Sequence, residues 1–260
     1  MKVERTATGI SGLDSMLSGG IPKGSSILVA GSPGNGKSIL AMQFLYNGVK
    51  EYNEPGIYVS LDDKLETVQR NFSTFDWDLD KIEIMSIIPY KHRVGDEIRY
   101  VVPPEINQPI SSTNDFITDE IFTTKRFSAD FLRKHLRRKI KKTNAKRVVI
   151  DPITPLVLKS NDAFEARQEI SSINEMLNDL GCTTIMTTDV MAEKPTITNL
   201  GMEAGIMHGV IMLYNIKKSN KRELGLEILK MNGTKHSKKT CSMEITDSGI
   251  AIHPKKNLFT

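Results

Sequence analysis

The sequence lacks the features of a membrane-spanning, secreted or cysteine-metal protein. No apolar run approaches the ~20 residues that a transmembrane helix needs, and the first residues contain no apolar signal-peptide core. It has only two cysteines, Cys182 and Cys241, which are too few for a metal cluster and need not pair. Reduced thiols are the default in the cytosol, so we expect a cytoplasmic protein without membrane contact.

Its size and composition are those of an ordinary globular protein. A chain of 260 residues, of which 39% are hydrophobic and 25% charged, is long enough for one large α/β domain with a full core. No internal repeat or domain-sized linker interrupts it, which predicts a single domain over residues 1–260. Residues from about 89 to 124 have little pattern and several prolines, which predicts an irregular insertion that is either functional or mobile.

Residues 31–38 read G-x-x-x-x-G-K-S, the pattern of a phosphate-binding loop. Apolar residues 27–30 suit a buried strand before it, and apolar residues that recur from Ile39 onward suit a helix after it. The glycines let backbone N–H groups face an anion, and the helix N-terminus adds partial positive charge. We expect Lys37 to reach the β- and γ-phosphates and Ser38 to ligate Mg²⁺. Because both flanking elements are present, we reject a chance match by a glycine-rich turn.

Two carboxylates, Asp62 and Asp63, follow the next expected strand, residues 56–61. Ligands in parallel α/β sheets bind beyond the carboxyl ends of the strands, so a carboxylate here can orient or deprotonate an attacking water. The alternative, of equal weight for Asp63, is an N-cap for the helix that starts near Lys64. One aspartate can cap while the other faces the nucleotide. With Lys37, Asp62 and Asp63 form the predicted catalytic set.

Residues 147–151 are a basic residue, three β-branched residues and Asp151. In phosphate-loop NTPases a buried strand of this kind carries an aspartate to the Mg²⁺ site, so Ser38 and Asp151 are the predicted metal ligands. Another expected strand, residues 183–187, ends at Thr187 and Thr188. Their hydroxyls can sense the γ-phosphate, or they can be no more than polar residues at a strand end.

Positive charge is concentrated in residues 125–147, which contain eleven Lys or Arg and one acid. This stretch carries +10, so the rest must carry −6 to give the net charge of +4. Apolar residues at helical spacing predict an amphipathic helix with a basic outer face: Phe127, Phe131, Leu132, Leu136 and Ile140. The basic face either binds a polyanion or is simply solvated. We favour the solvated face, because no aromatic residues interleave the charges to stack on bases.

The last part of the chain is expected to form antiparallel strands. Residues 209–216 and 223–231 read as strands joined by a charged hairpin tip, and residues 241–246 and 249–252 read as a final hairpin. Residues 98–102 are a candidate arm of a further hairpin within the insertion.

Together, these motifs resemble the KaiC domain, a branch of the RecA/RadA recombinase superfamily. The similar segments span nearly the whole chain except about 89–124: residues 8–14, 19–24, 31–38, 58–63, 75–79, 148–151, 183–188, 229–236 and 245–250. The chain looks like the single-domain archaeal kind rather than the tandem clock protein. The resemblance implies a RecA-like P-loop NTPase fold of the α/β class, with a central, mostly parallel twisted sheet flanked by helices and a C-terminal antiparallel hairpin extension.

The resemblance also implies a homo-oligomeric ring, usually of six copies, that binds ATP and Mg²⁺ at the subunit borders. One subunit would hold the phosphates through Ser32, Pro33, Gly34, Asn35, Gly36, Lys37, Ser38 and Ile39, with Thr74 near the adenine. The neighbouring subunit would contact the nucleotide through Lys230, Met231, Asn232, Thr234, His236, Thr246 and Asp247.

Two departures from the family pattern predict slow hydrolysis with binding intact. The family often has Arg where this chain has Asn232, and a trans arginine contributes ~10³–10⁵ in rate. The nearby Lys230 and Lys235 lack the guanidinium fork. Asp62 and Asp63 stand where the family carries a pair of glutamates, and each side chain is one methylene shorter.

We therefore expect a slowly hydrolysing ring ATPase that acts as a nucleotide-dependent switch or as an assembly or signalling factor, with a further protein as a candidate partner. The second hypothesis is a DNA-binding RecA/RadA paralogue in recombination or repair. It is less favoured, because no DNA-binding module is appended and residues 191–208 contain one lysine. The third is a scaffold that binds nucleotide without turnover, or an autokinase that modifies its own Ser or Thr.

Overall fold

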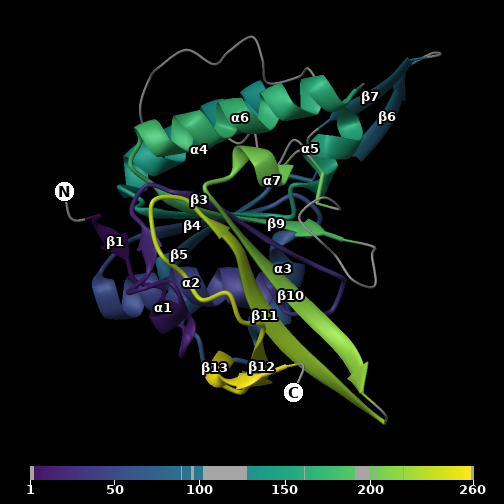
Figure 1. The fold of residues 1–260 in the computed structure, drawn as a ribbon. Coiled ribbons are helices and arrows are strands. Elements are labelled where there is room, and N and C mark those ends of the chain that lie inside the picture. Colours follow the sequence, from purple (N-terminus) through teal and green to yellow (C-terminus); the bar gives the residue numbers. More distant parts are fainter. Residues whose placement is uncertain are drawn as a thin grey trace.

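The computed structural model describes residues 3–88, 90–94, 97–101, 128–160, 162–190, 200–201, 203–218 and 220–258. Its centre is a nine-stranded sheet in the order β13–β12–β11–β10–β3–β9–β8–β4–β5 (Figure 1). The strands are β3 (Ser26–Gly31), β4 (Gly56–Ser60), β5 (Ile82–Ser86), β8 (Arg147–Asp151), β9 (Thr183–Asp189), β10 (Gly209–Lys218), β11 (Lys221–Met231), β12 (Cys241–Thr246) and β13 (Gly249–Asn257). The six strands from β10 to β5 pair in parallel, and β10 to β13 pair antiparallel. This confirms the predicted α/β fold with its C-terminal hairpin.

Helices cover both faces of the sheet (Figure 1). One face packs against α4 (Ala129–Thr143), α5 (Thr154–Lys159), α6 (Ala163–Asp179) and α7 (Glu203–Ile206), and the other against α1 (Leu13–Met16), α2 (Lys37–Tyr52) and α3 (Leu65–Phe72). Along β3, Leu28 and Ala30 belong to the first core, whereas Ile27 and Val29 belong to the second. A strand that is buried on both faces needs apolar residues at successive positions, which explains the continuous apolar run before the phosphate loop.

The register brings the carboxyl ends of the central parallel strands to one edge of the sheet. Gly31 of β3 pairs with Asp189 of β9, and Ser60 of β4 pairs with Asp151 of β8. The Leu61 N–H donates to the Asp151 carbonyl at 3.1 Å, which fixes the start of the segment that carries Asp62. Every polar residue that the sequence placed after a parallel strand therefore lies along this edge, where ligands of such sheets bind.

Several boundaries differ from the sequence expectation. β13 continues to Asn257, and β9 continues to Asp189 rather than ending at Thr187. A short helix, α7, lies within residues 191–208, where no helix was expected; residues 191–199 and 202 lie outside the described part. Residues 98–101 of the expected arm lie in a hairpin of β6 (Tyr90–Val94) and β7 (Glu97–Val101), and residue 102 and the rest of the 89–124 insertion lie outside the described residues. The remaining elements are β1 (Arg5–Thr6), β2 (Ile21–Pro22) and the 3-10 helix η1 (Leu79–Lys81).

Helix α4 has the predicted apolar stripe and basic face. It begins where the Ser128 hydroxyl accepts the Phe131 N–H at 3.1 Å, and its apolar residues from Phe131 to Ile140 are buried; Phe127 lies outside the described residues. Five cations are exposed on its outer side: Lys134, Arg137, Arg138, Lys141 and Lys142. Within the described part of the chain, no helix is long and apolar enough to cross a membrane.

Candidate functional site

The phosphate loop lies between β3 and α2 at the carboxyl edge of the sheet. β3 ends at Gly31 and α2 begins at Lys37, so residues 32–36, including Pro33 and Gly34, make the turn, and Ile39 lies in the first turn of the helix. Gly36 is the N-cap of α2 with a φ of 88°, a left-handed conformation that favours glycine. A Cβ at Gly36 would also lie 3.2 Å from Ile245 Cδ1. The motif glycine is therefore required by its backbone angle and by the neighbouring hairpin.

Two predicted nucleotide contacts, Ser32 and Asn35, use their side chains to hold the loop. The Asn35 amide donates to the Leu213 carbonyl of β10 at 2.9 Å, and the Ser32 hydroxyl donates to the Val190 carbonyl at 3.2 Å. Asn35 is buried, and its Oδ1 has no partner among the described residues. These contacts tie the loop to β10 and to the residue after β9, so both side chains shape the turn.

The Lys37 side chain is folded back over the loop. It is 8% exposed, and its Nζ donates to the Ser32 carbonyl at 3.0 Å and forms an ion pair with Asp189 Oδ1 at 2.8 Å. Asp189 was not among the predicted site residues, because the sequence reading ended β9 at the preceding threonines. The parallel register of β3 and β9, which pairs Asp189 with Gly31, is what brings it to the loop.

The two predicted metal ligands, Ser38 and Asp151, both lie near Tyr58. Asp151 is buried at the end of β8, where Oδ1 accepts a hydrogen bond from the Thr187 hydroxyl and Oδ2 accepts one from the Tyr58 hydroxyl. Burial, and then the Asp151 carboxylate, raise the pKa of Tyr58 well above its usual value, so the phenol remains a donor, and the nearby Ser38 hydroxyl partly opposes that rise. Tyr58 thus holds the Asp151 carboxylate and lies near Ser38, and sequence reasoning did not identify it as a site residue.

This donor set suits magnesium. Hydroxyl and carboxylate oxygens are the ligands that Mg²⁺ prefers, and it usually binds through one or two carboxylates together with phosphates and water. Within the described residues, no group of three or more His, Cys, Asp or Glu side chains could hold a metal ion. Ser38 and Asp151 therefore fit an ion that arrives with a nucleotide, rather than one held by the protein alone.

Asp62 and Asp63 lie at the same edge, and neither caps α3. The N-cap of α3 is Lys64, with no side-chain hydrogen bond, so the capping alternative is wrong. The Asp62 side chain is exposed, but partial desolvation, and then the charges of Asp151, Asp63 and Asp189, raise its pKa. Asp63 is anchored through its backbone, because its N–H donates to Ser60 Oγ at 2.9 Å. A carboxyl group with a raised pKa is better suited to accept a proton from water.

An aromatic cluster lies beside the loop helix. The Trp77 ring stacks on Phe75 at 4.4 Å, on Tyr46 of α2 at 5.5 Å and on Phe72 of α3 at 6.1 Å between centroids. Thr74, predicted to lie near the adenine, is an exposed residue in the turn between Phe72 and Phe75. The segment that carries Thr74 is therefore fixed to α2, which begins at the phosphate loop.

The β12–β13 turn, with Thr246 and Asp247, packs against α2 of the same chain. The Gln43 side chain of α2 exchanges two hydrogen bonds with the Ile250 backbone, at 2.7 and 3.2 Å, and the Trp77 indole N–H donates to a turn carbonyl at 3.4 Å. The resemblance assigned Thr246 and Asp247 to the neighbouring subunit. In the structure the turn lies with α2 and the aromatic cluster of its own chain, and which subunit's nucleotide it contacts stays a prediction.

The other residues that were predicted to contact the nucleotide of a neighbouring subunit form a second group, at the end of β11 and in the turn after it. They are Lys230, Met231, Asn232, Thr234 and His236. Met231 pairs with Gly209, and Gly209 pairs with Ile27 at the amino end of β3, whereas the phosphate loop starts at Gly31. Four residues of strand separate Ile27 from Gly31, which is roughly 13 Å. A single chain therefore does not bring this group to its own phosphate loop.

Local contacts fix this second group at the amino edge. Lys230 Nζ donates to the Met207 carbonyl at 2.8 Å, and the Asn232 N–H donates to the His208 carbonyl at 2.8 Å. Thr234 accepts a hydrogen bond from Arg5, and His236 Nδ1 lies 2.9 Å from the Ser237 carbonyl.

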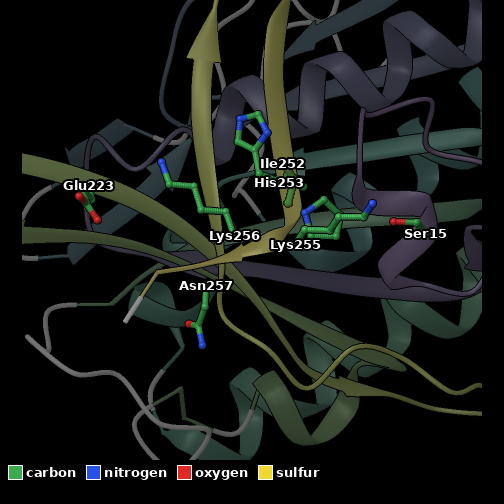
Figure 2. Close-up of a pocket in the computed structure, with 8 residues that line it drawn as sticks. Ser15, Glu223, Ile252, His253, Lys255, Lys256 and Asn257 are labelled. Atoms are coloured by element: carbon green, nitrogen blue, oxygen red, sulfur yellow. The ribbon is translucent and has the colours of Figure 1, made fainter. Parts of the chain in front are cut away.

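The structure also has an open hollow of about 770 Å³ at the C-terminal strands. Figure 2 shows the residues that line it, which include Ser15, Glu223 and the 252–257 part of β13. His253 in its wall pairs with Glu244 at 2.9 Å. None of the predicted site residues lines this hollow.

Comparisons with known proteins agree with this geometry. The family model "ATPase: KaiC" matches residues 6–257. A UPF0273 protein of Pyrococcus furiosus is 34% identical over 98% of this chain and 96% of its own length. A UPF0273 protein of Thermotoga maritima is 32% identical over 97% of both chains. The solved structure of a KaiC-like protein from Pyrococcus horikoshii OT3 superimposes with a TM-score of 0.75, at 29% identity, over 97% of this chain and all of that one.

The clock oscillator proteins that it also matches are about twice as long. The circadian clock oscillator protein KaiC of Parasynechococcus marenigrum is 31% identical over 98% of this chain, but the chain spans only 46% of that protein. The family model extends over almost the whole sequence and includes the phosphate loop, the Asp151 strand and the C-terminal hairpin. The chain belongs to the KaiC family of nucleotide-binding ATPases.

Proposed function

We propose that this protein is a Mg-ATP-dependent ring ATPase with slow turnover that acts as a nucleotide-dependent switch. The observation that carries the proposal is that Asp151 of β8, held by the hydroxyls of Tyr58 and Thr187, lies at the edge of the sheet where the phosphate loop begins, with Ser38 of the loop helix near the Tyr58 hydroxyl. Two motifs that are far apart in sequence thereby converge on a magnesium-type donor set, beside a loop whose helix N-terminus favours phosphate.

The chain's own residues have distinct roles in this proposal. The loop backbone and Lys37 bind the phosphates, and Ser38 and Asp151 hold the Mg²⁺, which neutralises charge on the β- and γ-phosphate oxygens. Asp62, whose pKa is raised, and Asp63 orient the attacking water and accept its proton. Thr74, Thr246 and Asp247 contact the base from the same subunit, because their segments are fixed to α2.

A second copy of the chain completes the site. The residues from Lys230 to His236 lie at the edge of the sheet opposite the phosphate loop, so they can reach a nucleotide only when it is bound to another subunit. A head-to-tail contact of this kind generates a ring when its rotation closes. We propose a hexamer, as the family resemblance implies.

Turnover is slow in this proposal for two chemical reasons. Asn232 carries no charge to stabilise the transition state, and a trans arginine in such sites is worth ~10³–10⁵ in rate. The aspartates at positions 62 and 63 also hold their carboxylates one methylene further back than glutamates would. Both features leave the phosphate loop and its binding contacts intact.

Replacing the loop lysine tests the site. Lys37→Ala removes the ammonium group that contacts the phosphates, so we expect Mg-ATP affinity measured by calorimetry to fall at least ~100-fold, by analogy with the loss of a charged hydrogen bond of ~3 kcal/mol. Lys81→Ala, which removes an exposed lysine from η1, is the matched control and should bind normally. Circular dichroism confirms that both variants are folded. Unchanged ATP affinity in folded Lys37→Ala would show that the nucleotide binds elsewhere.

A further inference from the structure

Lys37 already has a carboxylate partner within the protein. Its ammonium group is 8% exposed and lies 2.8 Å from Asp189 Oδ1, while the Asp189 side chain is 36% exposed. The same Nζ donates to the Ser32 carbonyl at 3.0 Å. The lysine that we expect to bind phosphate is therefore paired with the carboxylate of Asp189, the last residue of β9.

The end of β9 is fixed to the phosphate loop by the backbone as well. The Val190 N–H donates to the Gly31 carbonyl at 3.2 Å, and the Val190 carbonyl accepts from the Ser32 hydroxyl at 3.2 Å. Asp189 is therefore locked in register with the first glycine of the loop. The sheet therefore fixes the Asp189 backbone beside the loop that Lys37 follows.

Asp189 is also one of several carboxylates at the carboxyl edge of the sheet. Its charge contributes to raising the pKa of Asp62, together with the charges of Asp151 and Asp63. A triphosphate that enters this edge meets these carboxylates, and it has to take Lys37 away from Asp189. The energy of the ion pair is then subtracted from the energy of phosphate binding.

We propose that Asp189 is an internal counter-ion that competes with the nucleotide phosphates for Lys37 and so sets the affinity for ATP. The inference rests on the proposed function, because it assumes that Lys37 binds phosphate. Exchange of Lys37 between the two partners would release the Asp189 carboxylate whenever ATP is bound. Phosphate occupancy would then be transmitted to the end of β9, as the first step of the nucleotide switch.

The experiment compares ATP affinity in single variants of the full chain. Asp189→Asn keeps the side-chain shape and removes the charge, and we expect it to tighten Mg-ATP binding about five- to tenfold, since the pair with Lys37 is only partly exposed. Asp189→Glu retains a carboxylate and should stay within about twofold of the wild type. Asp62→Asn removes one charge from the same edge without touching Lys37, and controls for general electrostatics. The midpoint temperature of thermal unfolding, measured without nucleotide, should be lower for Asp189→Asn than for the wild type, because Lys37 loses its partner.

Each result bears on the proposal. A gain in affinity for Asp189→Asn that exceeds the gain for Asp62→Asn, together with lower stability without nucleotide, supports it. Equal gains in the two variants would mean that only the overall charge matters. Unchanged binding would mean that Asp189 does not compete for Lys37, and weaker binding would mean that Asp189 itself helps to bind the nucleotide. Each of these three outcomes overturns the proposal. Asp189→Ser removes the carboxylate in a second way if the first variant does not fold. Failure of the wild type to bind ATP would instead overturn the proposed function.

Discussion

Tyr58 is the buried hydrogen-bond donor that holds one oxygen of the Asp151 carboxylate. It lies in β4 between Ile57 and Val59, and its hydroxyl donates to Asp151 Oδ2 in the interior of the protein. Because burial and the neighbouring carboxylate raise its pKa, this phenol keeps its proton and continues to donate. A buried carboxylate oxygen that loses a donor costs far more than an exposed one, so the hydroxyl should matter for stability as well as for the position of Asp151.

Tyr58→Phe tests this role. The change leaves Oδ2 of Asp151 with one donor fewer, and we expect it to lower the free energy of unfolding by ~1–3 kcal/mol, measured by urea denaturation. Tyr46→Phe is the control, because the Tyr46 hydroxyl makes only a 3.4 Å contact with the Asp76 carbonyl at an exposed position. Equal losses in the two variants would show that the hydroxyl of Tyr58 does not support Asp151.

The sequence predicted some of these residues and not others, for identifiable reasons. Lys37 and Ser38 follow from a local motif, and Asp151 follows from a strand that ends in an acid. Asp189 depends on the register between β3 and β9, which the alternation of residues in one strand does not reveal. Tyr58 reads as an ordinary apolar member of a buried strand until the position of Asp151 in the neighbouring strand is known.

At the scale of elements, α2 is joined to β8 by a buried cation. Arg147 is fully buried; its Nε donates to Glu54 at 2.6 Å and its Nη1 to the Phe44 carbonyl at 2.9 Å. Burial lowers the pKa of Arg147, and Glu54 opposes that shift. Gly48 of α2 makes room for the guanidinium, since a Cβ there would lie 2.4 Å from Arg147 Cδ. The sequence showed Arg147 only as a basic residue at a strand start, because its partners come from α2 and the loop after it.

Gly48→Ala should therefore destabilise the protein, although alanine is the better helix former. The added methyl group meets an arginine that cannot move without breaking two hydrogen bonds, and we expect a loss of ~2 kcal/mol or more in the free energy of unfolding. Gly205→Ala is the matched control in α7, because a Cβ there lies 3.7 Å from its nearest neighbour, Arg167 Nη1. It should be neutral or stabilising in the same urea titration. A gain in stability for Gly48→Ala would mean that Arg147 moves aside at little cost.

At the scale of the whole molecule, the predicted nucleotide contacts lie on opposite edges of one sheet. The loop, the carboxylates and the β12–β13 turn are at the carboxyl edge, and the end of β11 is at the amino edge. The family resemblance grouped Thr246 and Asp247 with the end of β11, and proximity in sequence to β11 does not reveal that the final hairpin folds back onto α2 of its own chain. The division between edges requires a second copy if both groups bind one nucleotide.

Asn232→Arg tests whether a second copy contributes to hydrolysis. A guanidinium at this position can neutralise transition-state charge on a nucleotide bound by the neighbour, and we expect phosphate release to rise about tenfold or more, short of the full effect of an arginine finger. Asn232→Lys supplies the charge without the bidentate fork and should gain less. Native mass measured with and without Mg-ATP reports the assembly, and the gain should disappear at protein concentrations where only monomer remains. Asn232 lies at the edge of the sheet opposite its own phosphate loop, so a gain within one subunit is not expected. An equal gain in dilute monomer would contradict a site shared between subunits. The same rate in the assembled wild type, Asn232→Arg and Asn232→Lys would contradict it too.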